Sequence, residues 1–95
     1  LRRSSPHFGR AATMRLSAEM HEMAWIPPGF AHGFLVLSEY AEFLYKTTDY
    51  YLPAFERSLQ WNDPALNIDW PLDGTPLLSA KDQAALPLAE CEVFP

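Results

Sequence analysis

The chain has 95 residues, which is enough for one small domain. Its composition, 48% hydrophobic, 20% charged and 14% aromatic, is typical of a globular protein and excludes a disordered chain. The net charge of -5, without a basic stripe, argues against nucleic-acid binding, which depends on neutralising phosphates. A single cysteine excludes an internal disulfide and a zinc site built on cysteines. No membrane-spanning segment and no signal-peptide pattern are seen, so no membrane contact and a cytoplasmic location are expected.

The first half of the chain predicts a turn followed by a hairpin. Pro27-Pro28-Gly29 must turn, because neither proline can donate a ladder hydrogen bond. Residues 32–38 are rich in Phe, Val and Leu, and residues 41–48 (AEFLYKTT) carry aromatic and β-branched side chains. Both segments are predicted strands. The short connection Glu39-Tyr40 joins them into a hairpin.

The second half predicts one short strand, irregular coil and one short helix. Prolines recur every few residues after Tyr51, and tryptophans anchor the coil between them. Residues 79–86 form the predicted helix, with Ser79 as its N-cap and Asp82 at its third position. Several short strands separated by turns indicate an all-β fold, a barrel or a sandwich.

The hairpin places candidate chemistry on one face. Side chains alternate between the two faces along each strand. If Ser38 pairs with Ala41, one set of side chains from both strands lies on the same face of the hairpin. That set comprises His32, Phe34, Val36, Phe43, Tyr45 and Thr47. His32 and Tyr45 are then diagonal neighbours, about 7 Å apart at the backbone, and both can reach one small ligand. A register shift of one residue would separate them. The alternative is a hydrogen-bonded structural histidine and a tyrosine packed in the core.

Metal binding and nucleophilic catalysis have little support in the sequence. A metal site needs three or four convergent ligands, whereas His7 and His21 lie in polar segments expected to be loops. Cys91 lies in a tail that offers no neighbouring base. No metal is therefore expected.

Two further groups of residues are candidates for ligand contacts. Lys81 and Asp82 are adjacent, although without other information a solvated helix start is the favoured explanation for this pair. Tyr50 and Tyr51 point opposite ways on an extended chain, so one can pack while the other stacks on a flat ring.

Four motifs together resemble a known family. WIPPGFAHGF, AEFLYKTTDYY, the W-x-D-P-A-x-x-I-x-W stretch and LSAKD occur in the order and spacing of dTDP-4-dehydrorhamnose 3,5-epimerases, the cupin-like deoxysugar epimerases. The resemblance implies that residues 1–95 are one domain, the C-terminal part of an all-β, cupin-like jelly roll with a short C-terminal helix. The upstream half of such an enzyme would hold the catalytic histidine, a lysine, and arginines that bind the nucleotide phosphates.

The resemblance also implies an activity and a set of site residues. Such enzymes epimerise C3 and C5 of a nucleotide-linked 4-keto-6-deoxy sugar through an enolate, in dTDP-rhamnose biosynthesis, with no cofactor. Tyr45 is implied as the proton donor and Asp82 as the carboxylate that orients the catalytic histidine. His32, Glu56 and Lys81 are implied substrate contacts, and Tyr51 the aromatic ring that packs on the nucleotide or sugar. A nucleotide-sugar substrate and a homodimer are the implied partners.

Two alternatives stay open. The chain could be a truncated, non-catalytic β module that lacks the catalytic base. It could also belong to a related single-carbon sugar epimerase or keto-isomerase.

Overall fold

The computed structural model describes residues 1–95 and contains two short helices and no sheet. A 3-10 helix, η1, spans Pro53–Phe55, and an α-helix, α1, spans Ala80–Gln83. Two isolated parallel bridges join Arg2 to Phe94 and Leu59 to Leu86. The remainder is turns and coil, so the predicted all-β jelly roll is wrong for this chain.

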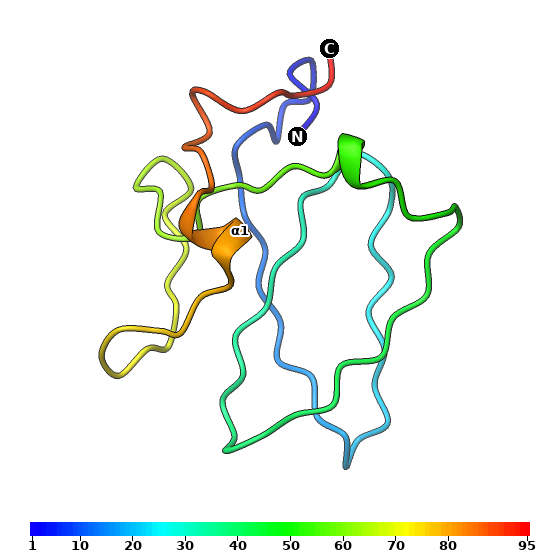
Figure 1. The fold of residues 1–95 in the computed structure, drawn as a ribbon, viewed down its shortest axis with the longest axis vertical. Helices are drawn as coiled ribbons and strands as arrows, with labels where there is room; N and C mark the ends of the chain where they lie inside the picture. The colour runs from blue at the N-terminus through cyan, green and yellow to red at the C-terminus, as the bar shows by residue number, and fades with distance from the viewer.

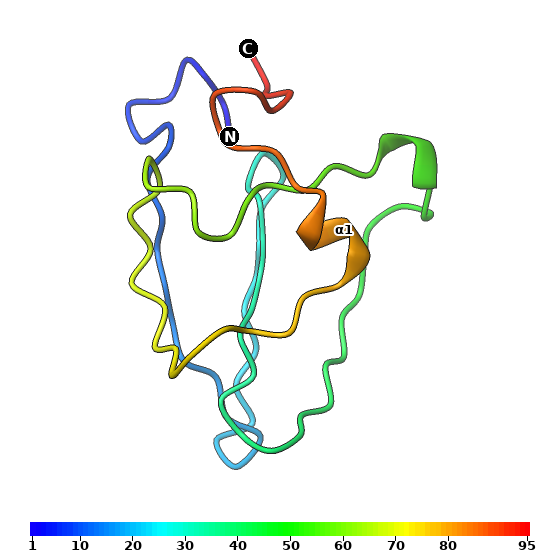
Figure 2. The ribbon, with the colours of Figure 1, turned by 60° about the vertical axis from the view of Figure 1, so that its left-hand side comes forward.

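Between residues 11 and 47 the backbone runs back and forth in extended segments that stand apart from one another (Figures 1 and 2). No backbone–backbone hydrogen bond begins or ends within residues 22–51. The whole chain has 21 such bonds, against about 65 expected for a folded domain of this length. The pairing is therefore missing, although the backbone is extended.

This absence of pairing overturns the predicted hairpin of residues 32–38 and 41–48. β-branched and aromatic side chains favour an extended backbone. A strand additionally needs a neighbour whose N–H and C=O groups lie within hydrogen-bonding distance, about 3 Å. The two segments make no such bond with each other, so they are extended segments and not paired strands.

Local turn and capping predictions are confirmed. The chain turns at Pro28-Gly29, where Gly29 has φ +93, a conformation that glycine adopts without steric cost. In α1, the Ser79 hydroxyl accepts a hydrogen bond from the Asp82 N–H (3.2 Å) and donates one to Asp82 Oδ2 (2.9 Å). The helix ends at Gln83, before the predicted end at residue 86.

The packed part of the molecule is built around the carboxylate of Asp63. Asp63 and Leu66 are the two buried residues of the chain. Asp63 Oδ1 accepts a hydrogen bond from the Ala65 N–H (2.9 Å), which closes the turn that follows. Asp63 Oδ2 accepts one from the Leu88 N–H (2.6 Å), so a single side chain joins two segments that are 25 residues apart.

Two tryptophans extend this packed region. The Trp70 indole N–H donates to the Trp61 carbonyl oxygen (2.8 Å). The two rings lie edge to face, with centroids 6.3 Å apart, an arrangement that aromatic pairs prefer. The tryptophan-anchored coil predicted for this half is thus confirmed.

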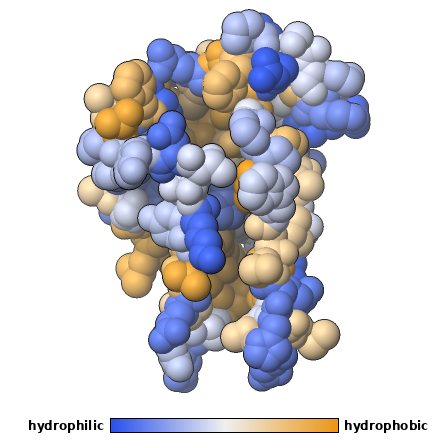
Figure 3. All heavy atoms as spheres, turned by 90° about the vertical axis from the view of Figure 1, so that its right-hand side faces the viewer, coloured by the Kyte–Doolittle hydropathy of each residue, from blue (hydrophilic) through white to orange (hydrophobic).

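Large apolar side chains remain on the surface, as the orange atoms of Figure 3 show for one face. Most of them belong to residues 14–55, where only Ser17, Gly29 and Leu35 are even half-buried. No helix in the chain combines the length and the apolar character that a membrane crossing requires.

Replacing Asp63 is expected to loosen the packed region. Asp63→Ala removes two charge-assisted hydrogen bonds from a buried position, at a cost of about 3 kcal/mol. Amide hydrogen exchange followed by NMR should become faster at Ala65 and Leu88. Asp69→Ala is the control, because Asp69 is exposed. Unchanged exchange at both amides in Asp63→Ala would contradict the anchoring role.

Candidate functional site

Three of the six predicted site residues meet at one carboxylate oxygen. Glu56 Oε2 accepts hydrogen bonds from the Tyr51 hydroxyl (2.7 Å) and from Lys81 Nζ (2.5 Å). Lys81 Nζ also lies 3.3 Å from the Tyr51 hydroxyl oxygen and 5.7 Å from the centre of the Tyr51 ring. These residues are called the Tyr51–Glu56–Lys81 cluster below.

The two helices position this cluster. Tyr51 lies just before η1, and Glu56 is the residue that caps the C-terminal end of η1. Lys81 lies in α1, whose start is fixed by Ser79. The tight turn of η1 therefore brings two side chains five residues apart together, and α1 supplies the third from 25 residues further along.

The ion pair changes the acidity of both partners. The Lys81 ammonium, hydrogen-bonded to Glu56, lowers the pKa of the Glu56 carboxyl, and the Tyr51 hydroxyl lowers it further. The Glu56 carboxylate in turn raises the pKa of Lys81, again with a smaller contribution from Tyr51. Both groups are therefore held in their charged forms at neutral pH.

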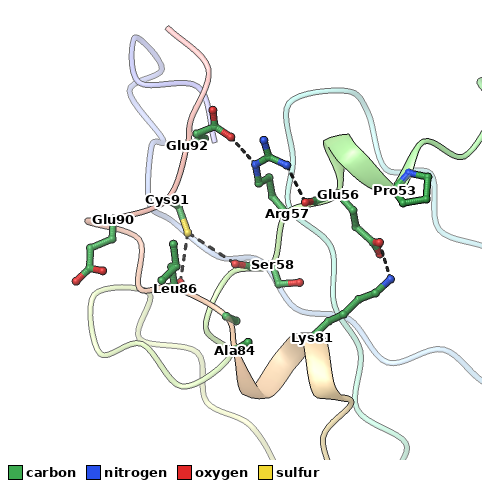
Figure 4. Close-up of a pocket in the computed structure, with 11 residues that line it drawn as sticks. Pro53, Glu56, Arg57, Ser58, Lys81, Ala84, Leu86, Glu90, Cys91 and Glu92 are labelled. Carbon is green, nitrogen blue, oxygen red and sulfur yellow. Dashed lines mark hydrogen bonds and ion pairs between the residues drawn. The ribbon is translucent and has the colours of Figure 1, made fainter.

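Glu56 and Lys81 line an open pocket of about 430 Å³ (Figure 4). This volume lies within the range of small-molecule sites, about 300–1,000 Å³. Next to Glu56 in the pocket wall, Arg57 forms an ion pair with Glu92 and donates to the carbonyl oxygens of Ala54 and Glu56. The pocket wall thus offers both signs of charge.

His32 and Tyr45 belong to a second group, which surrounds the ring of Phe43. The Phe34 ring stacks on Phe43 with centroids 4.3 Å apart, and the His32 ring lies 6.0 Å from Phe43. The centroid of the Tyr45 ring lies 5.5 Å from that of Phe43. The predicted hairpin register, with Ser38 paired to Ala41, is not found, and the Phe34 ring stacks on Phe43. His32 and Tyr45 nevertheless border one exposed row of aromatic rings.

Asp82, the sixth predicted residue, is used locally. Its Oδ2 accepts the Ser79 hydroxyl, while Oδ1 makes no hydrogen bond within the chain. It follows Lys81 directly in α1 and is exposed. One carboxylate oxygen is therefore free for an additional donor.

The sequence did not indicate two features of the site. Arg57 and Glu92 are 35 residues apart, and no local pattern pairs them. The second feature is the anchoring role of Asp63. The Asp63-Pro64 dipeptide indicates the start of a turn, but it does not indicate the hydrogen bond from the Leu88 N–H to Asp63.

Cys91 also lines the pocket. Burial raises the pKa of its thiol, and the negative charges of Asp63 and Glu90 raise it further. A protonated thiol is a poor nucleophile. No group of three or more His, Cys, Asp or Glu side chains in the chain is arranged to hold a metal ion.

The Glu56–Lys81 pair gives a pH-dependent expectation. Because the pKa of Glu56 is lowered on folding, its contribution to stability is present above the ordinary value of 4.5 and is lost as the pH falls through the lowered value. In a carboxyl-carbon NMR titration, Lys81→Met should return the pKa of Glu56 toward the ordinary value. Lys46→Met is the matched control, since Lys46 makes no ion pair. A Glu56 titration that Lys81→Met does not move would contradict the pairing.

Comparison with known proteins adds the family. The family model described as dTDP-4-dehydrorhamnose 3,5-epimerase matches residues 1–90. The chain is 60% identical, over its whole length, to the dTDP-4-dehydrorhamnose 3,5-epimerase of Pseudomonas aeruginosa, of which it covers 52%. It is 58% identical over 90% of its length to the enzyme of that name from Salmonella typhimurium, of which it covers 46%.

A relative with a different name is also similar. The dTDP-4-dehydrorhamnose 3-epimerase of Streptomyces niveus is 42% identical over 95% of the chain, which covers 43% of that protein. The chain therefore spans about half the length of the curated relatives it matches. Because the family model matches all but the last few residues, the chain belongs to the dTDP-4-dehydrorhamnose 3,5-epimerase family.

Proposed function

We propose that this chain contributes the proton donor and part of the substrate-binding wall of a nucleotide-sugar 3,5-epimerase. The substrate would be dTDP-4-dehydro-6-deoxy-D-glucose and the product dTDP-4-dehydro-L-rhamnose, in dTDP-rhamnose biosynthesis. The observation that carries the proposal is the family match over residues 1–90, which includes all six predicted site residues. Since the chain spans about half of its relatives, the activity is proposed for the complete enzyme.

The reaction needs a base, an acid and a way to hold an enolate. The C4 ketone acidifies the hydrogens on C3 and C5. A base takes one proton, the electron pair of the broken C–H bond moves into the enolate, and an acid returns a proton from the opposite face. Hydrogen-bond donors near the enolate oxygen stabilise its charge. No oxidation takes place, so no redox cofactor is required.

Tyr45 is the proposed acid. Its ring lies in an exposed aromatic row that also contains His32, the proposed substrate contact, and both rings neighbour Phe43. The base would come from the part of the relatives that this chain does not match. Asp82 would accept a hydrogen bond from that base through its free Oδ1, as the carboxylate does in other histidine–aspartate pairs.

The Tyr51–Glu56–Lys81 cluster is the proposed binding end. Lys81 supplies a positive charge, Glu56 an acceptor, and Tyr51 a ring large enough to cover a nucleobase or a sugar. The mutual hydrogen bonds hold the three side chains in one arrangement before a ligand arrives. Such preorganisation reduces the entropy that binding costs.

Two finer points belong to the same proposal. The resemblance implies a homodimer, which light scattering on the complete enzyme would measure. The Streptomyces niveus relative favours a second candidate function, epimerisation at C3 alone. In heavy water, deuterium at both C3 and C5 of the product supports the double epimerase, and deuterium at C3 alone supports the second candidate.

Tyr45→Phe tests the proposed acid. The chain is grafted in place of the matching residues of the Pseudomonas aeruginosa enzyme, which gives a full-length protein. Loss of the acid is expected to lower kcat by about 100-fold or more, with substrate binding retained, because general acid catalysis contributes about 10²–10⁴-fold. Product formation is followed by NMR.

Tyr40→Phe is the control for that experiment, because Tyr40 is an exposed tyrosine outside both groups of site residues. It should leave kcat unchanged. A Tyr45→Phe enzyme as fast as the Tyr40→Phe enzyme would remove Tyr45 from the mechanism.

A further inference from the structure

The guanidinium of Arg57 makes three contacts, and two of them hold the backbone that carries Glu56. Arg57 Nη1 donates hydrogen bonds to the carbonyl oxygens of Ala54 (3.0 Å) and Glu56 (2.9 Å). The Glu56 N–H in turn donates to the carbonyl oxygen of Pro53 (3.1 Å), which closes the turn of η1. The N–H and the C=O of Glu56 are therefore both hydrogen-bonded, and this fixes the direction in which its side chain leaves the backbone.

The third contact joins this backbone to the C-terminal tail. Arg57 Nε donates to Glu92 Oε2, and the two side chains form an ion pair (Figure 4). The tail is itself held just before Glu92, because the Cys91 N–H donates to the Pro87 carbonyl oxygen (3.1 Å). One guanidinium thus links the end of η1 to a segment 35 residues further along the chain. Glu92 lies outside residues 1–90, the part that the family model matches, so the family match does not include this link.

The chemistry of these contacts favours a role in positioning over a role in stability. The side chains of Arg57 and Glu92 are 54% and 75% exposed, and ion pairs as exposed as this one contribute little to stability. Arginine holds several donors in one rigid plane, whereas lysine carries the same charge as a point on a flexible stem. The groups that lower the pKa of Glu56 are Lys81 and Tyr51, and not the charge of Arg57. Arg57 therefore acts on Glu56 through the geometry of the backbone.

We propose that Arg57 is a positioning residue for Glu56. Its guanidinium holds the end of η1 so that the Glu56 carboxylate meets Lys81 and Tyr51 before a ligand arrives. Glu92 holds the guanidinium from the tail. Arg57 itself is not a contact of the ligand. That this placement serves substrate binding rests on the proposed function, whereas the placement of Glu56 does not.

A carboxyl-carbon NMR titration of Glu56 tests the placement, in the full-length protein that carries this chain grafted into the Pseudomonas aeruginosa enzyme. Arg57→Ala and Arg57→Lys should both raise the pKa of Glu56 toward the ordinary value of 4.5, because neither new side chain can hold two carbonyl oxygens and Glu92 at once. Arg15→Ala is the control, since Arg15 is exposed and makes no ion pair. An unchanged pKa in Arg57→Ala would overturn the proposal. Full rescue by Arg57→Lys would also overturn it, because the charge alone would then suffice.

Steady-state kinetics of the same variants test the consequence for substrate binding. Arg57→Lys should raise KM by about fivefold and leave kcat unchanged, because a side chain that is not held beforehand must be ordered when the substrate binds. Partial unfolding would instead lower kcat through a smaller active fraction, with the KM and the pKa of Glu56 unchanged, and that result would overturn the proposal. A raised pKa of Glu56 with an unchanged KM would count against the binding role of Glu56 in the proposed function and leave the positioning standing.

Glu92→Ala tests the link to the tail. It should shift the pKa of Glu56 in the same direction as Arg57→Ala but by less, because the two bonds to carbonyl oxygens remain. The double variant should match Arg57→Ala, since Glu92 acts only through the guanidinium. Glu22→Ala is the control, because Glu22 is exposed and makes no ion pair. Additive shifts of the Glu56 pKa in the double variant would contradict the link.

Discussion

The carboxylate of Asp63 is the interaction on which the ordered part of the structure depends. One oxygen closes the turn after residue 63, and the other holds the backbone of Leu88. The bridge between Leu59 and Leu86 and the pairing of Trp61 with Trp70 lie on the two segments that this side chain joins. α1 lies between those segments in the sequence, so the position of Lys81 depends on them as well. A buried aspartate that makes no hydrogen bond to any proposed site residue thus helps to place one corner of the candidate site.

The two halves of the chain differ in how their backbone groups are satisfied. After residue 57, turns, bridges and the Asp63 carboxylate take up many of the polar groups. Between residues 22 and 51 the conformation is largely extended, but none of the backbone groups takes part in a backbone–backbone hydrogen bond. Extended conformation and strand pairing are therefore separate properties. The first follows from the φ and ψ preferences of each residue, whereas the second requires another segment at the correct distance.

This distinction explains which features could be predicted from the sequence. The turn at Gly29 and the Ser79 cap depend on residues within three positions of each other, and both were predicted. The hairpin was wrong because its register argument assumed that two extended neighbours must pair. The meeting of Tyr51, Glu56 and Lys81 spans 30 residues, and no periodic pattern contains it. Their selection came from the resemblance to a family, and their proximity from the structure.

The single oxygen shared within the Tyr51–Glu56–Lys81 cluster has a consequence for specificity. A ligand that takes the Lys81 ammonium from Glu56 Oε2 leaves that carboxylate with the Tyr51 hydroxyl alone. The Glu56 carboxylate, having lost its hydrogen bond from Lys81, then needs a new donor, which a ribose hydroxyl or an N–H of a nucleobase can provide. A fully ionised anion such as sulfate brings negative charge and no such donor, so it would break the ion pair and leave Glu56 without a new donor. In the proposed binding role, the cluster would favour a ligand that accepts a hydrogen bond from Lys81 and donates one to Glu56, as a nucleotide sugar can.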